Sequence, residues 1–143
     1  MQFGTSIDVA ATPECVWSVM SDIEHWPDWT ATVTSAERLD AGPLTVGSKF
    51  RVRQPKLLPA VFTVTWVDAN QGFAWTTSGP GYSVIARHSI EPIPAGSRVT
   101  LSLQFSGVIG KLAARMLRDL NQRYMGIEAA GLKRQSERAT AAS

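Results

Sequence analysis

The sequence contains a single cysteine, Cys15, and no long apolar run. One cysteine excludes an intramolecular disulfide and any zinc site built from several thiolates. No stretch approaches the roughly 18 apolar residues that cross a bilayer, and no basic segment followed by an apolar one opens the chain, so we expect a cytoplasmic protein. Metal-binding helix motifs, phosphate-binding glycine loops and Gly-x-Ser-x-Gly elbows are also missing, so the sequence predicts no metal and no cofactor.

Charge is scarce as well, at 18% of 143 residues with a net charge of +2. Such a small net charge gives no reason to expect a nucleic-acid partner. The positive charge gathers in residues 108–138, which form either a solvated helix face or a docking surface for an acidic partner or a membrane. We expect membrane contact to be weak, and the sequence is compatible with a monomer or a homodimer. Apolar residues make up 44% of the chain, enough for one domain with a real core.

Alternating apolar and polar residues predict strands over most of the chain. The clearest is 97–106, in which every second residue is apolar, so that one face is buried and the other is wet. Residues 2–9 alternate in the same way, and turn signals between Val33 and Ser106 separate six candidate strands. Together they predict an antiparallel sheet with a single apolar face.

Two short helices are predicted between the first strand and the rest. Thr12 can cap a helix that begins at Pro13, where a missing N–H costs nothing, and that ends near Ser21. Asp22 can cap a second short turn, which Pro27 should end because the residue before a proline avoids the helical region.

A helical period replaces the strand period from Ile109 onward. At 100° per residue, an apolar arc of about 140° runs along one side of a long helix as far as Gly131. Charges enter that arc beyond Lys133. We therefore expect one domain over residues 1–138 and a loose tail over residues 139–143.

A sheet with one apolar face and a helix with one apolar stripe must cover each other. Because a twisted sheet curls, a straight helix cannot touch it everywhere, and a cavity with apolar walls is expected between them. The residues expected to line it and bind a ligand are Phe62, Val64, Trp66, Trp75, Tyr82, Val84, His88, Leu101, Leu103, Met116, Leu120, Arg123, Tyr124 and Ile127. For the tryptophans, simple filling of the core is the alternative.

The order strand, two short helices, six-stranded meander and long helix resembles the START and polyketide cyclase superfamily, whose architecture is called the helix-grip fold. The motifs Pro13-Glu14-x-Val16-Trp17 and Trp26-Pro27-x-Trp29 carry the resemblance, which covers nearly the whole chain. It implies an α+β fold: a seven-stranded curved antiparallel sheet, two short helices, and a long C-terminal helix enclosing a hydrophobic cavity. Members include lipid and sterol carriers, plant hormone receptors and aromatic polyketide cyclases, so the fold alone does not settle the function.

An apolar loop is predicted to control access to the cavity. Leu57, Leu58 and Pro59 lie in a segment that exposes two leucines between two prolines. This favours a gate over an apolar opening, or a contact with a membrane or a partner. Leu58-Pro59-Ala60 stands where the hormone receptors of the superfamily have a Leu-Pro-Ala stretch that closes the pocket.

Three polar residues are candidates for catalysis, each with a structural alternative. His88 could exchange a proton near neutral pH or could be a hydrogen-bonded core histidine. Arg123 could meet a carboxylate or enolate, or its head could reach solvent along the core. Tyr124 could point its hydroxyl into the cavity or belong to the core.

The leading hypothesis is binding or transport of a small hydrophobic molecule, such as a lipid, an aromatic polyketide or an isoprenoid. One alternative is a cyclase or aromatase that uses His88, Arg123 and Tyr124 as acid/base and oxyanion-stabilising groups. The other is a module that docks on a membrane or partner through its basic C-terminal helix.

Overall fold

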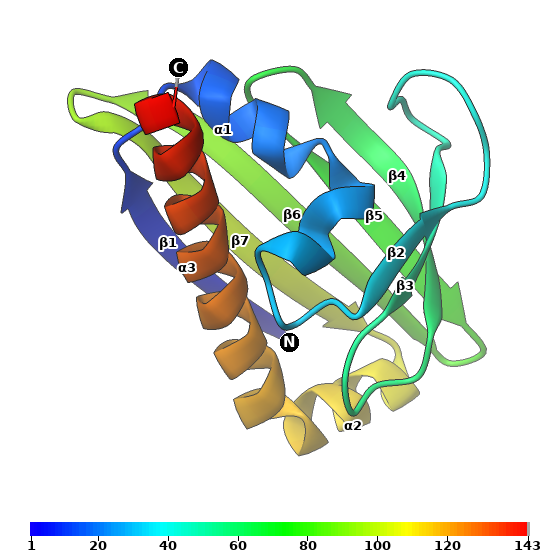
Figure 1. Cartoon of the computed structure of the whole chain (residues 1–143). Coiled ribbons are helices and arrows are strands. Elements are labelled where there is room, and N and C mark those ends of the chain that lie inside the picture. Colours follow the sequence, from blue (N-terminus) through cyan, green and yellow to red (C-terminus); the bar gives the residue numbers. More distant parts are fainter. Residues whose placement is uncertain (143) are drawn as a thin grey trace.

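The computed structural model describes residues 1–142 and contains one seven-stranded antiparallel sheet with helices on its concave face (Figure 1). The strand order is β1-β7-β6-β5-β4-β3-β2, so β2 to β7 form a meander whose last strand, β7, pairs with β1. The strands are β1 (Gln2–Val9), β2 (Ser35–Arg38), β3 (Lys49–Arg53), β4 (Ala60–Asp68), β5 (Gly72–Gly79), β6 (Tyr82–Ile93) and β7 (Gly96–Ser106). The predicted α+β helix-grip architecture is confirmed.

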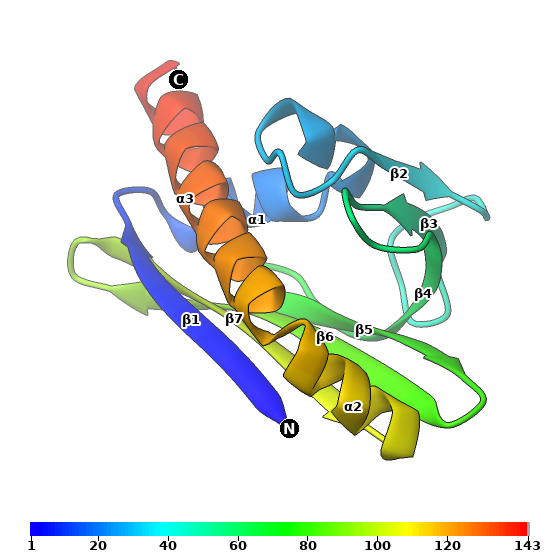
Figure 2. The same cartoon turned by 90° about the horizontal axis from the view of Figure 1, so that it is seen from below.

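The helices all lie on one side of the sheet. They are α1 (Pro13–Met20), the 3-10 helix η1 (Ile23–Asp28), α2 (Val108–Met116) and α3 (Arg118–Ala142). The long helix α3 runs across the sheet with α1 beside it (Figures 1 and 2). The shorter helix α2 comes just before α3 in the chain and lies at an angle to it. Within the described part of the chain, none of these helices has the length and hydropathy needed to cross a membrane.

Local sequence explains the first helix and part of the second. The Thr12 hydroxyl accepts a hydrogen bond from the Cys15 amide at 3.2 Å, with Pro13 in the first turn, as predicted. Asp22 does not cap η1 with its side chain but bonds the His25 ring instead, at 2.8 Å. Pro27 lies inside η1 rather than ending it, so that prediction was wrong. The fixed φ of proline fits a 3-10 turn, and its missing N–H removes only one hydrogen bond there.

One irregularity in β4 reverses the direction of a predicted cavity residue. Val64 lies opposite Trp75, but a β-bulge follows, and Trp66 lies opposite Ala74. An extra residue in one strand moves the next side chain to the other face of the sheet. Trp66 therefore lies on the outer face, where the Arg87 guanidinium sits over its ring at 4.6 Å. Trp66, which the sequence placed among the lining residues, therefore lies outside the cavity wall.

The predicted single C-terminal helix is broken at Leu117. This residue has φ −109° and ψ 18° and separates α2 from α3. The break interrupts the 100° phase on which the apolar arc was built. Arg123, which follows the break, is exposed to solvent. Met116, the last residue of α2, is 76% exposed.

The predicted loose tail was wrong as far as Ala142, because α3 continues to that residue, and Ser143 lies outside the described residues. The charges beyond Lys133 are not a sign of disorder, since they bond to the body of the protein. The Glu137 carboxylate accepts hydrogen bonds from Lys133 Nζ at 2.7 Å and from the Ala10 amide at 2.9 Å. The Thr140 hydroxyl contacts the Cys15 sulfur at 3.2 Å, so α1 supports this end of α3.

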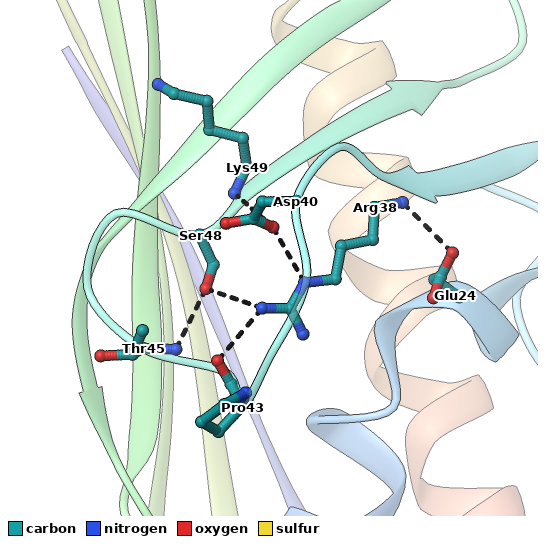
Figure 3. A network of polar contacts seen from close by, with 7 residues as sticks. All are labelled: Glu24, Arg38, Asp40, Pro43, Thr45, Ser48 and Lys49. Atoms are coloured by element: carbon teal, nitrogen blue, oxygen red, sulfur yellow. Dashed lines mark hydrogen bonds and ion pairs between the residues drawn. The ribbon is translucent and has the colours of Figure 1, made fainter.

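A polar network centred on Arg38 anchors the β2–β3 connection (Figure 3). Its guanidinium donates to Asp40 at 2.9 Å, to the Pro43 carbonyl at 3.1 Å and to the Ser48 hydroxyl at 3.3 Å. The Arg38 amide donates to the Glu24 carboxylate of η1 at 3.2 Å. One arginine thus ties the edge of the sheet to the helix that covers the core.

Candidate functional site

A cavity of about 500 Å³ lies between the concave face of the sheet and the helices α2 and α3. The sheet supplies most of the apolar wall, with Val52, Phe62, Trp75, Val84, Ala86, Leu101, Leu103 and Phe105. The helices contribute Ile109, Ala113, Leu117 and Met125. The gap between a curled sheet and the helices that cover it is therefore not filled by the protein's own side chains.

The structure brings together many of the residues predicted to line this cavity. Those in its wall are Phe62, Trp75, Tyr82, Val84, His88, Leu101, Leu103 and Tyr124, together with the predicted gate residues Leu57, Leu58 and Pro59. Those outside its wall are Val64, Trp66, Met116, Leu120, Arg123 and Ile127. That the lining residues bind a ligand, and that the loop is a gate, remain predictions.

The displaced residues have physical explanations. Val64 faces inward but is buried in the core, at 1% exposure. Trp66 faces outward because of the β-bulge. The predicted residues of the long helix were placed by a continuous helical wheel, which the break at Leu117 invalidates. The side of α3 that lines the cavity carries Asn121, Tyr124, Met125 and Glu128.

His88 lies in the cavity wall within an aromatic cluster. Its ring stacks on Phe73 with centroids 4.4 Å apart and planes 7° apart, and its centroid lies 5.4 Å from that of Trp26. Burial lowers the pKa of His88 to about 4, against the opposing effect of a backbone hydrogen bond with Phe73. The imidazole is therefore neutral near pH 7. Its Nδ1 has no hydrogen-bond partner among the described residues.

Glu128 is a second titratable group in the wall, and it was missed from the sequence. The side chain is half-buried, lines the cavity, and receives no hydrogen bond or ion pair from the described residues. Burial raises the pKa of its carboxyl to about 7. Near neutral pH this group is therefore present in both its protonated and its ionised forms.

Asn121 is the third polar group and was missed as well. It is 7% exposed, lines the cavity, and its Nδ2 has no partner within residues 1–142. The apolar arc hid both residues because it counted apolar side chains only. A signal was present: Asn121, Met125, Glu128 and Leu132 follow one another at spacings of four, three and four residues, which is one side of a helix.

Within residues 1–142, no three His, Cys, Asp or Glu side chains come together in a way that could hold a metal ion.

A family model described as "Polyketide cyclase / dehydrase and lipid transport" matches residues 1–137. The chain belongs to this family. The match runs from β1 to the last turns of α3, and it confirms the resemblance to the START and polyketide cyclase superfamily. Membership of the polyketide cyclase and lipid transport family supports binding of a hydrophobic ligand in general.

Solved structures agree with this fold. Protein TTHA0849 from Thermus thermophilus is 20% identical, with a TM-score of 0.76 over 100% of this chain and 99% of that chain. The Zhui aromatase/cyclase from Streptomyces sp. R1128 is 18% identical, with a TM-score of 0.79 over 98% and 95% of the two chains. Ara h 8.0201 is 16% identical, with a TM-score of 0.72 over 94% and 97%. No curated protein sequence matches the chain.

One hydrogen bond connects the β3–β4 loop to α3 in the cavity wall. The Tyr124 hydroxyl donates to the backbone carbonyl of Pro55. In the same loop Lys56 adopts a left-handed backbone conformation with φ 66°, and Leu58 is 89% exposed. The loop therefore borders the cavity on one side, presents an apolar side chain to solvent, and is held to α3 at Pro55.

Proposed function

We propose that this member of the polyketide cyclase and lipid transport family binds and carries a small hydrophobic molecule in its internal cavity. The observation that carries the proposal is the cavity of about 500 Å³, whose size is typical of small-molecule sites. Phe62 and Trp75 stack in its wall with centroids 4.9 Å apart. Large flat walls of this kind favour aromatic polyketides and isoprenoids, and the volume also accommodates a lipid chain.

The enzymatic alternative receives less support. Arg123 lies outside the cavity wall, so the expected set of His88, Arg123 and Tyr124 is not assembled there. The Tyr124 hydroxyl is engaged by Pro55, and the pKa of His88 is lowered to about 4 by burial. These observations favour a carrier over an acid/base enzyme that relies on those three groups.

The test is a ligand screen on delipidated protein. A ligand present at 100 times its Kd should stabilise the fold by about 2.7 kcal/mol, which raises the melting temperature by several degrees. Ala113→Phe should abolish this shift by filling the cavity, because Ala113 lines it. Leu112→Phe is the matched control, since Leu112 is 57% exposed and lies outside the wall. No shift for any hydrophobic compound would contradict the proposal, and native mass spectrometry can identify a retained molecule.

The outer side of α2 supports a second candidate function, docking on an anionic membrane. Val108, Leu112 and Met116 recur every four residues on that side, and all three are exposed. Lys111 and Arg115 accompany them, and α2 contains no acidic residue. An apolar face with flanking cations is typical of helices that lie at the surface of anionic lipid bilayers.

Cosedimentation with vesicles tests this second candidate. We expect binding to vesicles of phosphatidylcholine and phosphatidylglycerol that weakens as salt increases, and none to phosphatidylcholine alone. Leu112→Ser with Met116→Ser should abolish that binding, while Val46→Ser, at a position that is also exposed, should not. Equal binding by all variants, or self-association through α2 in place of vesicle binding, would contradict it.

A further inference from the structure

Two polar side chains of α3 line the mainly apolar cavity without partners among the described residues. The amide of Asn121 is buried and its Nδ2 is unpaired. The carboxyl of Glu128 lines the same cavity and receives no hydrogen bond. Leaving a buried donor unpaired weakens the fold, so a ligand that pairs with these groups recovers a lost interaction.

The two groups lie at opposite ends of the part of α3 that lines the cavity. They are seven residues apart, which is two turns on the same side of α3 and about 10 Å along its axis. Asn121 precedes Met125, which belongs to the apolar cluster of Phe3 and Phe105. Glu128 precedes Ala129, which belongs to the larger core cluster. The apolar stretch between Asn121 and Glu128 is therefore long enough for a rigid ligand of two fused rings.

The chemistry of the two groups selects one kind of polar atom. Asn121 has an unpaired N–H that is fully buried, so donation to a ligand requires the amide to turn toward the cavity. A protonated carboxyl at Glu128 also donates, whereas a carboxylate confined beside an apolar ligand is unfavourable. A ligand that places a hydrogen-bond acceptor at each end satisfies both.

We propose that Asn121 and Glu128 bind the two ends of an uncharged, elongated ligand that carries a hydrogen-bond acceptor, such as a carbonyl oxygen, at each end. This proposal rests on the proposed carrier function and specifies the ligand class of the same cavity. A ligand with an anionic end at Glu128 is disfavoured, because its charge and the Glu128 carboxylate would repel each other in a site of low polarity.

The experiment compares two probes of nearly the same shape, 2,6-diacetylnaphthalene and 2,6-diisopropylnaphthalene. Only the first has acceptors, one at each end. Titration of wild-type protein at pH 6, followed by tryptophan fluorescence, should show the diketone binding at least about tenfold more tightly than the hydrocarbon. The ratio of the two affinities is the measured quantity, because it removes effects that both probes share.

Substitutions test which residues cause the tighter binding of the diketone. Asn121→Leu and Glu128→Leu should each lower the ratio by about threefold or more, while Glu128→Gln should preserve it because glutamine keeps an N–H donor. Arg123→Leu is the control, since Arg123 lies on the same helix outside the wall. Raising the pH from 6 to 8.5 should lower the ratio for wild type, as Glu128 ionises, but not for Glu128→Gln.

The outcomes separate this inference from the carrier function. If both probes bind with equal affinity, or if the ratio is unchanged in both leucine variants, the two-ended recognition is wrong and hydrophobic binding stands. If cationic 2,6-bis(aminomethyl)naphthalene binds more tightly than the diketone at pH 6, the ligand class is wrong. If neither naphthalene probe nor any compound of the hydrophobic screen binds, the carrier function fails, and this inference fails with it.

Discussion

Replacement of Glu128 by glutamine should stabilise the protein in a pH-dependent way. The pKa of Glu128 is raised by burial from 4.5 to about 7. Between these values the unfolded chain releases the proton while the folded protein keeps it, so ionisation favours the unfolded state as the pH rises. The penalty is absent well below pH 4.5, grows through that window, and is complete above about pH 7. Glutamine does not ionise and avoids it.

The pKa difference sets an upper limit of about 3 kcal/mol for this penalty. The side chain is only half-buried, so solvent screens part of its charge, and we expect a gain of about 1–3 kcal/mol for E128Q at pH 8. Urea unfolding followed by tryptophan fluorescence measures it at several pH values between 4 and 8.5. Asp68→Asn, which removes an exposed carboxyl, is the control and should show no comparable trend.

His88 makes the comparison of E128Q with wild type sharper. Its pKa is lowered from 6.5 to about 4, so the unfolded chain binds a proton that the folded protein refuses, and stability falls as the pH drops below 6.5. In wild type the two trends oppose each other between about pH 4.5 and 6.5. In E128Q the opposing Glu128 trend is removed, and stability should rise with pH over that range. A stabilisation by E128Q of equal size at every pH would refute the reasoning.

Three further predictions concern α3. Tyr124→Phe removes the hydrogen bond to the Pro55 carbonyl and should lower the free energy of unfolding by about 1 kcal/mol. Hydrogen exchange of the backbone amides in residues 54–58 should become faster, and ligand release should become quicker. Unchanged exchange would contradict a role for this bond in holding the loop. Gly131→Ala should destabilise the fold by about 2 kcal/mol or more in urea unfolding, because its Cβ would lie 2.2 Å from the Trp29 carbonyl oxygen. Gly126→Ala on the same helix meets nothing within 4 Å and should stabilise by up to about 1 kcal/mol.

Much of the architecture was predictable from local patterns. The Thr12 cap, the Pro13 start and the alternation of β7 each depend on interactions between residues close in sequence. Once one face of each strand is apolar, burial selects the same face throughout the sheet. The placement of His88 in the interior followed from this alternation alone.

The candidate site was less predictable, because single irregular residues decide which way later side chains point. The bulge before Trp66 moves that ring to the outer face, and the break at Leu117 turns Arg123 away from the cavity. No glycine or proline in the sequence marks either the bulge or the helix break. Asn121 and Glu128 were missed for a related reason. Polar residues interrupt the apolar periodicity of a helix, and only the tertiary structure shows that these two border a cavity.

The amino-acid sequence by itself determined the order of strands and helices, their apolar faces, and hence the curved sheet covered by a terminal helix. Only the tertiary structure decided which side chains border the cavity and which carboxyl is held there with a raised pKa. Periodicity records the relative directions of neighbours within one regular element. The rotation of that element against the sheet, and the low polarity it imposes on Glu128, arise from contacts between distant parts of the chain.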